Sequence, residues 1–211
     1  SCFNIRDKFL KKECFITPSR GVEIAIVVGG GNFWRGRIGE GMDKPTADYM
    51  GMLATIINSM ALQGELEKQG LKAKLLSGIA IDPIAESMSR SRAIEYLESG
   101  KVVIIAGGTG NPYFTTDTAA VLRAIEIKAD VVLKGTRVDG VYTADPEKDP
   151  KAVKYSKISF QEVYEKNLNV MDLTAITMCK ENNLPIIVFN MNINGNLLLL
   201  LKGEEIGTLV E

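Results

Sequence analysis

The stretch from Ala106 to Asp117 carries the residues whose types and spacing are best suited to chemistry. It reads AGGTGNPYFTTD and holds three glycines, three threonines and one asparagine. Glycines let backbone N–H groups turn toward a bound anion, and small hydroxyls add hydrogen bonds. An ordinary turn with Thr115 or Thr116 as a helix N-cap would explain any single glycine, but it does not need the whole set. The stretch therefore indicates a loop that closes around a nucleotide.

The absence of histidine limits the chemistry that this loop can serve. It excludes Ser-His-Asp and Cys-His catalysis, zinc bound by histidine and imidazole acid–base chemistry. A reaction must use lysine, arginine, carboxylates, hydroxyls and backbone dipoles. Phosphoryl transfer between nucleotides fits this set, because an acceptor phosphate is largely ionised at neutral pH and needs no general base.

Two further places combine the end of a predicted strand with residue types that bind phosphate. The strand 22–28 runs into Gly29-Gly30-Gly31, and Arg35 beside these glycines can form a forked contact with phosphate oxygens. The strand 131–134 ends at Lys134, for which a solvated strand-end lysine is the plain alternative. Ligands of open α/β sheets bind at the carboxyl ends of the strands, so we expect the three junctions to converge on phosphate.

Strands and helices alternate along the chain. This order predicts an α/β fold with a mainly parallel sheet that is covered on both faces, and no linker divides it into separate domains. Asp139-Gly140 signals a hairpin turn. The predicted strands are 22–28, 73–76, 101–106, 131–134, 186–189 and 208–210, and the predicted helices are 43–68, 89–98, 118–128, 159–166, 172–181 and a short one near Leu197.

The predicted helix 43–68 is apolar around most of its circumference from Tyr49 to Ile57. Such a helix must be buried on several sides. It is either a central core helix or, as we favour, a helix between the core and a second subunit. Asp48 is a carboxylate beside this apolar stretch, and it either caps the helix or reaches a ligand hydroxyl.

The composition excludes several classes of partner. With 25 basic and 26 acidic residues among 211, the formal charge is −1, which gives no electrostatic case for binding nucleic acid or an anionic membrane. The scattered cysteines Cys2, Cys14 and Cys179 have no metal-ligand spacing. No signal peptide or run of membrane-spanning length is evident, so the cytoplasm is the expected location.

From about Gly21 to the C-terminus, the chain resembles the bacterial uridylate (UMP) kinases of the amino-acid kinase family. The motif from Thr109 to Thr116 separates this branch from others. The resemblance implies a three-layer α/β/α sandwich with a mainly parallel central sheet. It rests on GGGNFWRG (29–36), DYMGMLAT (48–55), GTGNPYFTTD (108–117), the segment 130–146, VMDLT (170–174) and VFNMN (188–192).

The family pattern also implies how the chain is divided. Residues 21–211 would be one amino-acid-kinase-like domain, with an acceptor-binding part over about 21–128 and an ATP-binding part over about 129–211. Residues 1–20 would be an atypical N-terminal segment.

Site residues follow from the resemblance position by position. Asp48 would bind the ribose of UMP, the threonine loop would surround uracil and its phosphate, and Tyr142 would flank the adenine of ATP. The catalytic residues would be Arg35, Asp117 and Lys134, with the charge of Asp117 compensated by lysine or magnesium. The UMP set is Gly30, Asp48, Thr109, Gly110, Asn111, Pro112, Tyr113, Phe114, Thr115 and Thr116, and the ATP set is Gly31, Arg35, Thr136, Tyr142 and Asp145. No direct metal ligand is assigned.

The implied reaction is in-line attack by a UMP phosphate oxygen on the γ-phosphate of ATP, with Mg²⁺ bridging the ATP phosphates. It would serve pyrimidine nucleotide synthesis in a cytoplasmic homohexamer built as a trimer of dimers, activated by GTP and inhibited by UTP. We expect uridine to be preferred over cytidine, because the loop would match N3–H and O4. A mismatch at a buried site costs about 1–3 kcal/mol per unpaired group.

Residues 1–20 depart from the family pattern. The family begins with a strand that ends in a Lys-Leu-Ser-Gly type motif, whose lysine reaches the ATP phosphates, and these residues contain no such motif. We expect the sequence in hand to omit or replace that strand. If the chain had instead lost it, the missing charge contact would cost on the order of several kcal/mol of transition-state stabilisation.

Two other functions stay open at this point. One is a different small-molecule kinase of the same fold, acting on a carboxylate or carbamate. The other is a catalytically weak or inactive oligomer that binds nucleotides or oxyanions. Binding without turnover would distinguish the second from a kinase.

Overall fold

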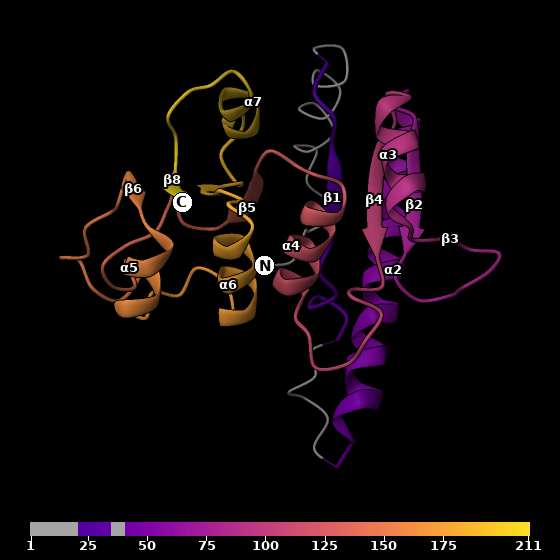
Figure 1. Cartoon of the computed structure of the whole chain (residues 1–211), viewed down its shortest axis with the longest axis horizontal. Helices are drawn as coiled ribbons and strands as arrows, with labels where there is room; N and C mark the ends of the chain where they lie inside the picture. The colour runs from indigo at the N-terminus through magenta and orange to yellow at the C-terminus, as the bar shows by residue number, and fades with distance from the viewer. Residues whose placement is uncertain (1–20, 35–40) are drawn as a thin grey trace. The chain divides into compact units, whose positions relative to one another are not determined.

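The computed structural model describes residues 21–34 and 41–211 (Figure 1). The chain forms two compact units, of which the first ends at Arg123 and the second is Ala124–Glu211. The helix α4 (Thr116–Glu126) contains the point of division. The predictions for Arg35 and for residues 1–20 lie outside the described residues.

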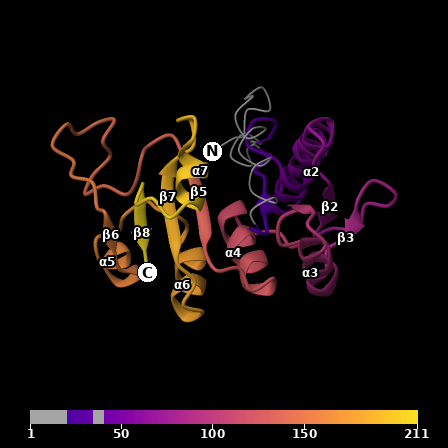
Figure 2. The same ribbon diagram turned by 90° about the horizontal axis from the view of Figure 1, so that it is seen from above.

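The first unit is built on a sheet of four parallel strands in the order β1-β4-β2-β3. Every residue of β4 is apolar and buried, as expected of a parallel strand with both faces covered. The helices α2 (Lys44–Lys68) and α3 (Arg90–Glu98) lie on opposite faces of the sheet (Figure 2). The strands are β1 (Ala25–Val27), β2 (Ala73–Ser77), β3 (Glu86–Ser87) and β4 (Val102–Ala106).

Helix α2 begins where the sequence predicted, and Asp43 is its N-cap. The Asp43 carboxylate accepts a hydrogen bond from the Thr46 N–H at 3.1 Å, which satisfies a backbone donor that the first helical turn leaves unpaired. Asp48, for which capping was one alternative, is therefore not the cap. Leu66, on the core side of the helix, is fully buried, whereas other apolar residues of α2 remain exposed.

Helix α4 begins two residues earlier than predicted. The Thr115 hydroxyl accepts a hydrogen bond from the Thr118 N–H at 3.1 Å, so this threonine acts on the first turn as the sequence suggested. The loop between β4 and α4 is accordingly 107–115.

The second unit is built on a sheet in the order β5-β7-β8-β6, in which only β7 and β8 are antiparallel. Ile186 of β7 and Val210 of β8 are fully buried in this unit. The strands are β5 (Val132–Thr136), β6 (Lys157–Ile158), β7 (Ile186–Asn190) and β8 (Thr208–Val210), and the helices are α5 (Phe160–Glu165), α6 (Leu173–Glu181) and α7 (Asn196–Leu201).

Two details predicted for the second unit are wrong. Lys134 lies inside β5, paired with Val188, because the strand continues to Thr136. Asp139-Gly140 does not form a hairpin: β5 pairs with β7 in parallel, and the chain after Gly140 is held by a side chain of β8 instead of returning along β5. A local turn signal was overridden by the longer-range pairing.

The mainly parallel α/β fold class is confirmed. The strands belong to two four-stranded sheets, one in each unit, where the sequence predicted one central sheet. Across residues 21–34 and 41–211, no helix has the length and apolarity needed to cross a membrane.

Candidate functional site

The glycines after β1 lie directly on helix α2. A Cβ added to Gly30 would come within 2.7 Å of the Gly51 carbonyl oxygen and 2.9 Å of the Ala54 Cβ, so no side chain fits there. The Gly30 carbonyl accepts hydrogen bonds from the N–H groups of Phe33 and Trp34, both at 3.0 Å. The loop is thus folded tightly back on itself, with Gly30 buried against α2.

Asn58 of α2 holds this loop in place through hydrogen bonds. Its side chain is only 1% exposed, and its Nδ2 donates to the Gly29 carbonyl at 2.7 Å. Asn58 and Asn32 also exchange amide hydrogen bonds at 2.6 and 3.0 Å. Sequence analysis missed Asn58, although an amide on the apolar face of a helix was a signal that it is paired.

The backbone of the loop after β4 packs directly against the backbone at the end of β2. Gly107 and Gly110 have φ of +72° and +85°, values that favour glycine. A Cβ on Gly78 would lie 2.8 Å from the Gly108 carbonyl oxygen. Gly78, which sequence analysis also missed, therefore allows the two strand ends to pack together.

A buried arginine supports the same loop. Arg123 of α4 is 8% exposed, and its guanidinium donates to the Gly108 carbonyl at 3.2 Å. The Gly108 carbonyl is therefore hydrogen-bonded to this side chain within the protein. Nothing in the spacing of Arg123 distinguished it from an ordinary helical arginine.

Asp48 and the threonine loop are brought together, as the resemblance implied. The Tyr113 N–H donates to Asp48 Oδ2 at 2.7 Å, and Lys44 lies 2.9 Å from the same oxygen. Partial burial raises the pKa of Asp48, but the hydrogen bonds from the Tyr113 backbone and Lys44 together hold that pKa below its ordinary value. The site therefore keeps an ionised carboxylate in contact with Tyr113, which lies 65 residues further along the chain.

The remaining residues of the loop differ in how they are used. The Thr109 hydroxyl closes a turn inside the loop, since it donates to the Asn111 carbonyl at 3.0 Å and accepts from the Asn111 N–H at 3.1 Å. Tyr113, at φ +72°, is 66% exposed, and Phe114 is half exposed. These two rings therefore have surface available for a ligand.

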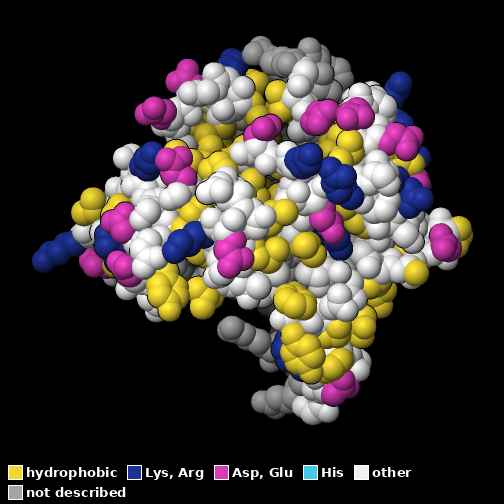
Figure 3. All heavy atoms as spheres, in the orientation of Figure 1, with side chains coloured by type: hydrophobic (Ala, Val, Ile, Leu, Met, Phe, Trp, Pro, Cys, Tyr) yellow, Lys and Arg dark blue, Asp and Glu magenta, His cyan; other side chains and the backbone are white. Residues whose placement is uncertain are grey.

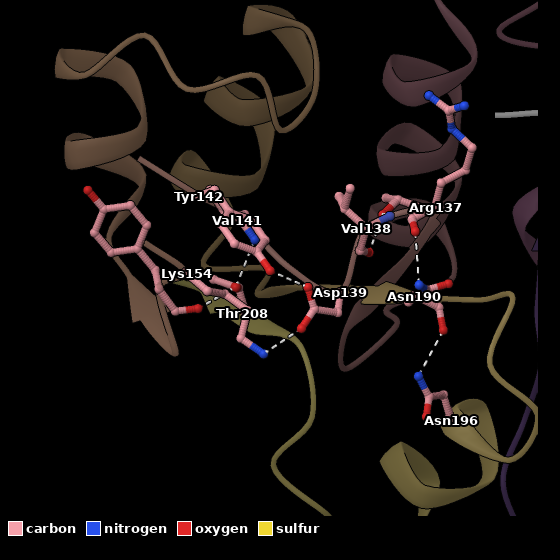
Figure 4. Close-up of polar contacts among 11 residues, drawn as sticks. Arg137, Val138, Asp139, Val141, Tyr142, Lys154, Asn190, Asn196 and Thr208 are labelled. Atoms are coloured by element: carbon pink, nitrogen blue, oxygen red, sulfur yellow. Dashed lines mark hydrogen bonds and ion pairs between the residues drawn. The ribbon is translucent and has the colours of Figure 1, made fainter. Parts of the chain in front are cut away.

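In the second unit, the loop after β5 is held at its beginning by a strand neighbour. The Thr136 hydroxyl donates to the Val138 carbonyl at 2.6 Å and accepts from the Val138 N–H at 3.1 Å. Asn190, at the end of β7, donates to the Arg137 carbonyl at 2.8 Å (Figure 4). The amide of Asn196 in turn donates to the Asn190 carbonyl at 2.9 Å.

Tyr142 is oriented by a carboxylate and a lysine (Figure 4). Its hydroxyl donates to Asp139 Oδ1 at 2.5 Å, while Lys154 donates to Asp139 Oδ2 at 3.0 Å. The hydrogen bond from Tyr142 is the main cause that lowers the pKa of Asp139, and the same bond raises the pKa of Tyr142. The phenol is therefore committed to Asp139, which leaves the faces of the half-buried ring as the part that a ligand can use.

The expected catalytic and ATP residues that the structure describes belong to different elements. Asp117 is in the first turn of α4 and Lys134 is in β5. Asp145 accepts from the Glu147 N–H at 3.0 Å and pairs with Lys148 at 3.2 Å. The backbone bond from Glu147 is the main cause that lowers the pKa of Asp145. Within its own unit the structure thus joins Asp48 to the threonine loop, and Thr136 and Tyr142 belong to one anchored loop.

No group of three or more acidic or cysteine side chains that could hold a metal ion is found in the part of the chain that the structure describes. Mg²⁺ bound to a nucleotide needs only one or two carboxylates besides phosphates and water. Asp117, which is partly buried in the first turn of α4, is a carboxylate of the first unit that fits this requirement.

Comparison with known proteins relates the chain to a family of kinases. A sequence profile of the Amino acid kinase family matches residues 12–190. The chain is 62% identical over 192 residues to a uridylate kinase of Parabacteroides distasonis, covering 90% of this chain and 81% of that protein. It is 58% identical over 193 residues to a uridylate kinase of Bacteroides thetaiotaomicron, covering 90% and 82%.

A solved structure agrees with these sequence relatives. The UMP kinase from Bacillus anthracis superposes with a TM-score of 0.93 at 38% identity, covering 96% of this chain and 84% of that one. The resemblance stated from the motifs is thereby confirmed.

Proposed function

This chain belongs to the amino acid kinase family, and from that premise we propose that it transfers the γ-phosphoryl group of ATP to UMP, giving UDP and ADP. The relatives at 58 and 62% identity are uridylate kinases. The structural observation that carries the proposal is the contact of Asp48 with the Tyr113 N–H at 2.7 Å. It holds a carboxylate suited to a ribose hydroxyl against a loop suited to a base and a phosphate.

On the acceptor side, we assign UMP to the first unit. Asp48 would accept from the ribose hydroxyls, and the tight turn at Gly30, which packs on α2, would hold backbone groups near the phosphate. Thr115 and Thr116 lie at the start of α4, where the helix dipole favours an anion. Tyr113 and Phe114 would cover the base with their exposed rings. Thr109, Gly110, Asn111 and Pro112 complete the proposed acceptor loop.

On the donor side, we assign ATP to the second unit and to Gly31. The ring of Tyr142 would stack on adenine, because its hydroxyl is held by Asp139 and its faces are left for the base. Thr136 and Asp145 would lie near the ribose and phosphates. The hydrogen bonds made by Thr136, Asn190 and Tyr142 anchor the loop after β5 and support the assignment.

The chemistry needs cations more than a base. In-line transfer spreads negative charge over the moving phosphoryl group, and Lys134 together with Arg35 and backbone N–H groups would neutralise it. Mg²⁺ bound with ATP would supply further positive charge, with Asp117 as a carboxylate able to orient its water. UMP itself supplies the nucleophilic oxygen.

Assembly and regulation belong to the same proposal. Four apolar side chains of α2 are 44–50% exposed, namely Tyr49, Leu53, Ile57 and Met60. They follow helical spacing on one face, and Figure 3 shows hydrophobic side chains gathered over this part of the helix. We propose that a second copy of the chain covers them within a homohexamer that GTP activates and UTP inhibits. A cytoplasmic location is likewise part of the proposal.

The experiment that tests the proposal is a coupled assay of ADP release with ATP, Mg²⁺ and either UMP, CMP, aspartate or carbamate as acceptor. We expect turnover with UMP and a clear preference over CMP, which lacks N3–H and O4. Turnover with aspartate or carbamate and not UMP would overturn the substrate assignment. Calorimetric binding of UMP without any release of ADP would instead support the weak or inactive binding protein.

A further inference from the structure

We propose that two buried threonines, Thr55 and Thr208, are positioning residues, each of which holds the loop of one substrate. Thr55 would set the affinity for UMP and Thr208 the affinity for ATP. This inference rests on the proposed function, because it takes from that function the assignment of one loop to UMP and another to ATP. Thr208 was not among the residues that the sequence indicated, and Thr55 appeared only as the last residue of the motif DYMGMLAT (48–55).

Thr55 lies in α2 beneath the glycine loop of the first unit. It is 5% exposed, and its hydroxyl donates to the Met52 carbonyl one turn earlier in the helix at 2.6 Å. The same oxygen accepts a hydrogen bond from the Gly107 N–H at 2.9 Å. A hydroxyl has one proton and two lone pairs, so donation to the helix turns a lone pair toward Gly107. Gly107 is the first residue of the loop assigned to UMP.

Thr208 has the same arrangement in the second unit. It is the first residue of β8 and is fully buried. Its hydroxyl donates to the Tyr155 carbonyl and accepts from the Val141 N–H at 2.8 Å (Figure 4). A side chain on Gly140 would collide with this hydroxyl, so the chain passes directly over Thr208. Val141 immediately precedes Tyr142, the residue assigned to adenine.

These hydroxyls matter because they satisfy buried backbone donors at the places where the loops begin to turn. Both hydrogen bonds are buried and join residues 52 and 67 positions apart in the sequence. Removing the acceptor leaves a buried N–H unpaired, and the loop must move to regain a partner. Displacement of a substrate-binding group by about 1 Å can cost as much as 100-fold in rate. Each loss should therefore affect the substrate of its own loop.

The test exchanges each threonine for valine, which has nearly the same shape and lacks the hydroxyl. Thr208→Val should raise the KM for ATP about tenfold, equivalent to about 1.4 kcal/mol, and leave the KM for UMP within about twofold. Thr55→Val should raise the KM for UMP about tenfold and leave the KM for ATP within about twofold. The variants are matched controls for each other, because residue type, burial and hydrogen-bond length are alike. Thr55→Ser and Thr208→Ser keep the hydroxyl and should restore both KM values.

Three outcomes would overturn the inference while the wild type phosphorylates UMP. They are equal rises of both KM values in one variant, a lowered melting temperature with both KM values unchanged, and serine variants that behave like the valine variants. If Thr208→Val does not fold, the pair Thr208→Ser and Thr208→Cys replaces it, since a thiol is a much weaker hydrogen-bonding group in nearly the same volume. ATP KM should then rise only in the cysteine variant.

Failure of the proposed function is recognised separately. If the wild type releases no ADP with UMP, calorimetric titration with Mg²⁺ and a non-hydrolysable ATP analogue, and separately with UMP, takes the place of KM. The same crossed pattern in Kd would support the positioning role without turnover. A wild-type chain that binds neither nucleotide would overturn both the function and the inference.

Discussion

At the residue scale, the polar side chains that define the site are hydrogen-bonded to other groups of the protein before any ligand binds. Asp48 accepts from the Tyr113 N–H, Asn58 donates to the Gly29 carbonyl and the Tyr142 hydroxyl donates to Asp139. Groups held in this way lose little freedom on binding, which favours affinity. Conservative substitutions can therefore distinguish a side chain that contacts the substrate from one that only supports the loop.

Tyr142 allows such a separation. Tyr142→Phe removes the hydroxyl that donates to Asp139 and keeps the ring, so we expect the KM for ATP to change less than about threefold. Tyr142→Ala removes the ring and should raise it about tenfold or more, since stacking of a base on an aromatic side chain is worth about 1–3 kcal/mol. Steady-state kinetics with the KM for UMP as internal control makes the measurement. A phenylalanine variant as impaired as the alanine variant would show that ATP binding depends on the hydroxyl and not on the ring.

Asp48 predicts a dependence on pH. Its pKa is below the ordinary value of 3.8 in the folded protein, so its contribution to stability is fully present above that value and is lost as pH falls through the folded pKa. We expect Asp48→Asn to lower the melting temperature at about pH 7, and the difference from wild type to shrink at about pH 3. Thermal unfolding monitored by circular dichroism at both pH values is the measurement. A difference that is unchanged at low pH would mean that the carboxylate charge is not what stabilises the loop.

At the scale of elements, the strand ends approach one another so closely that glycine is required in the loops between them. Gly78 follows β2 and Gly107, Gly108 and Gly110 follow β4, with three of these at positive φ. Their packing is backbone against backbone, which leaves N–H and carbonyl groups, and not side chains, at the end of the sheet. The site is therefore sensitive to the addition of a single methyl group.

Gly110 and Gly100 provide a matched pair for this prediction. Their φ values are +85° and +73°, but a Cβ on Gly110 would collide with the Gly78 carbonyl, whereas one on Gly100 would meet nothing within 4 Å. Both alanine variants should lose about 1–2 kcal/mol of stability from the left-handed conformation. Only Gly110→Ala should also raise the KM for UMP, by more than about tenfold, because the loop must move. Equal KM values in the two variants would contradict the assignment of this loop to UMP.

At the scale of the whole molecule, helix α2 serves two purposes on different faces. Its buried face supports the glycine loops through Thr55 and Asn58, and its exposed face carries the apolar stripe of Tyr49, Leu53, Ile57 and Met60. An apolar stripe on a long, well-formed helix is a surface that self-association would bury. Assembly on this face would therefore bear on the same helix that supports the proposed UMP site.

Leu53 tests the assembly. Leu53→Glu places a charge in the stripe, and we expect it to reduce the molar mass measured by light scattering after size-exclusion chromatography. Leu173→Glu is the control, because Leu173 is also exposed but lies on α6 of the other unit. An unchanged mass for Leu53→Glu would contradict a subunit interface on α2. A lowered mass for both variants would show that association is not specific to the stripe.

Local sequence patterns determined the type and approximate position of nearly every element. The bounds of α2 follow from a long apolar pattern, and β4 follows from an unbroken apolar run. The family was also evident from motifs, and the same motifs predicted the threonine loop and Asp48 as site residues, because motifs depend on residues adjacent in sequence.

Only the tertiary structure decided which distant groups meet. Thr55 and Gly107 are 52 positions apart, and Val141 and Thr208 are 67 apart, so no periodicity or spacing joins them. The same reason explains the errors at Lys134 and at Asp139-Gly140, where pairing of β5 with β7 replaced a local strand end and a local turn. Hydrogen bonds between remote segments form only after the chain has paid the entropy of bringing them together. The sequence therefore indicates the loops that we propose to bind nucleotides, and the fold determines what holds them in place.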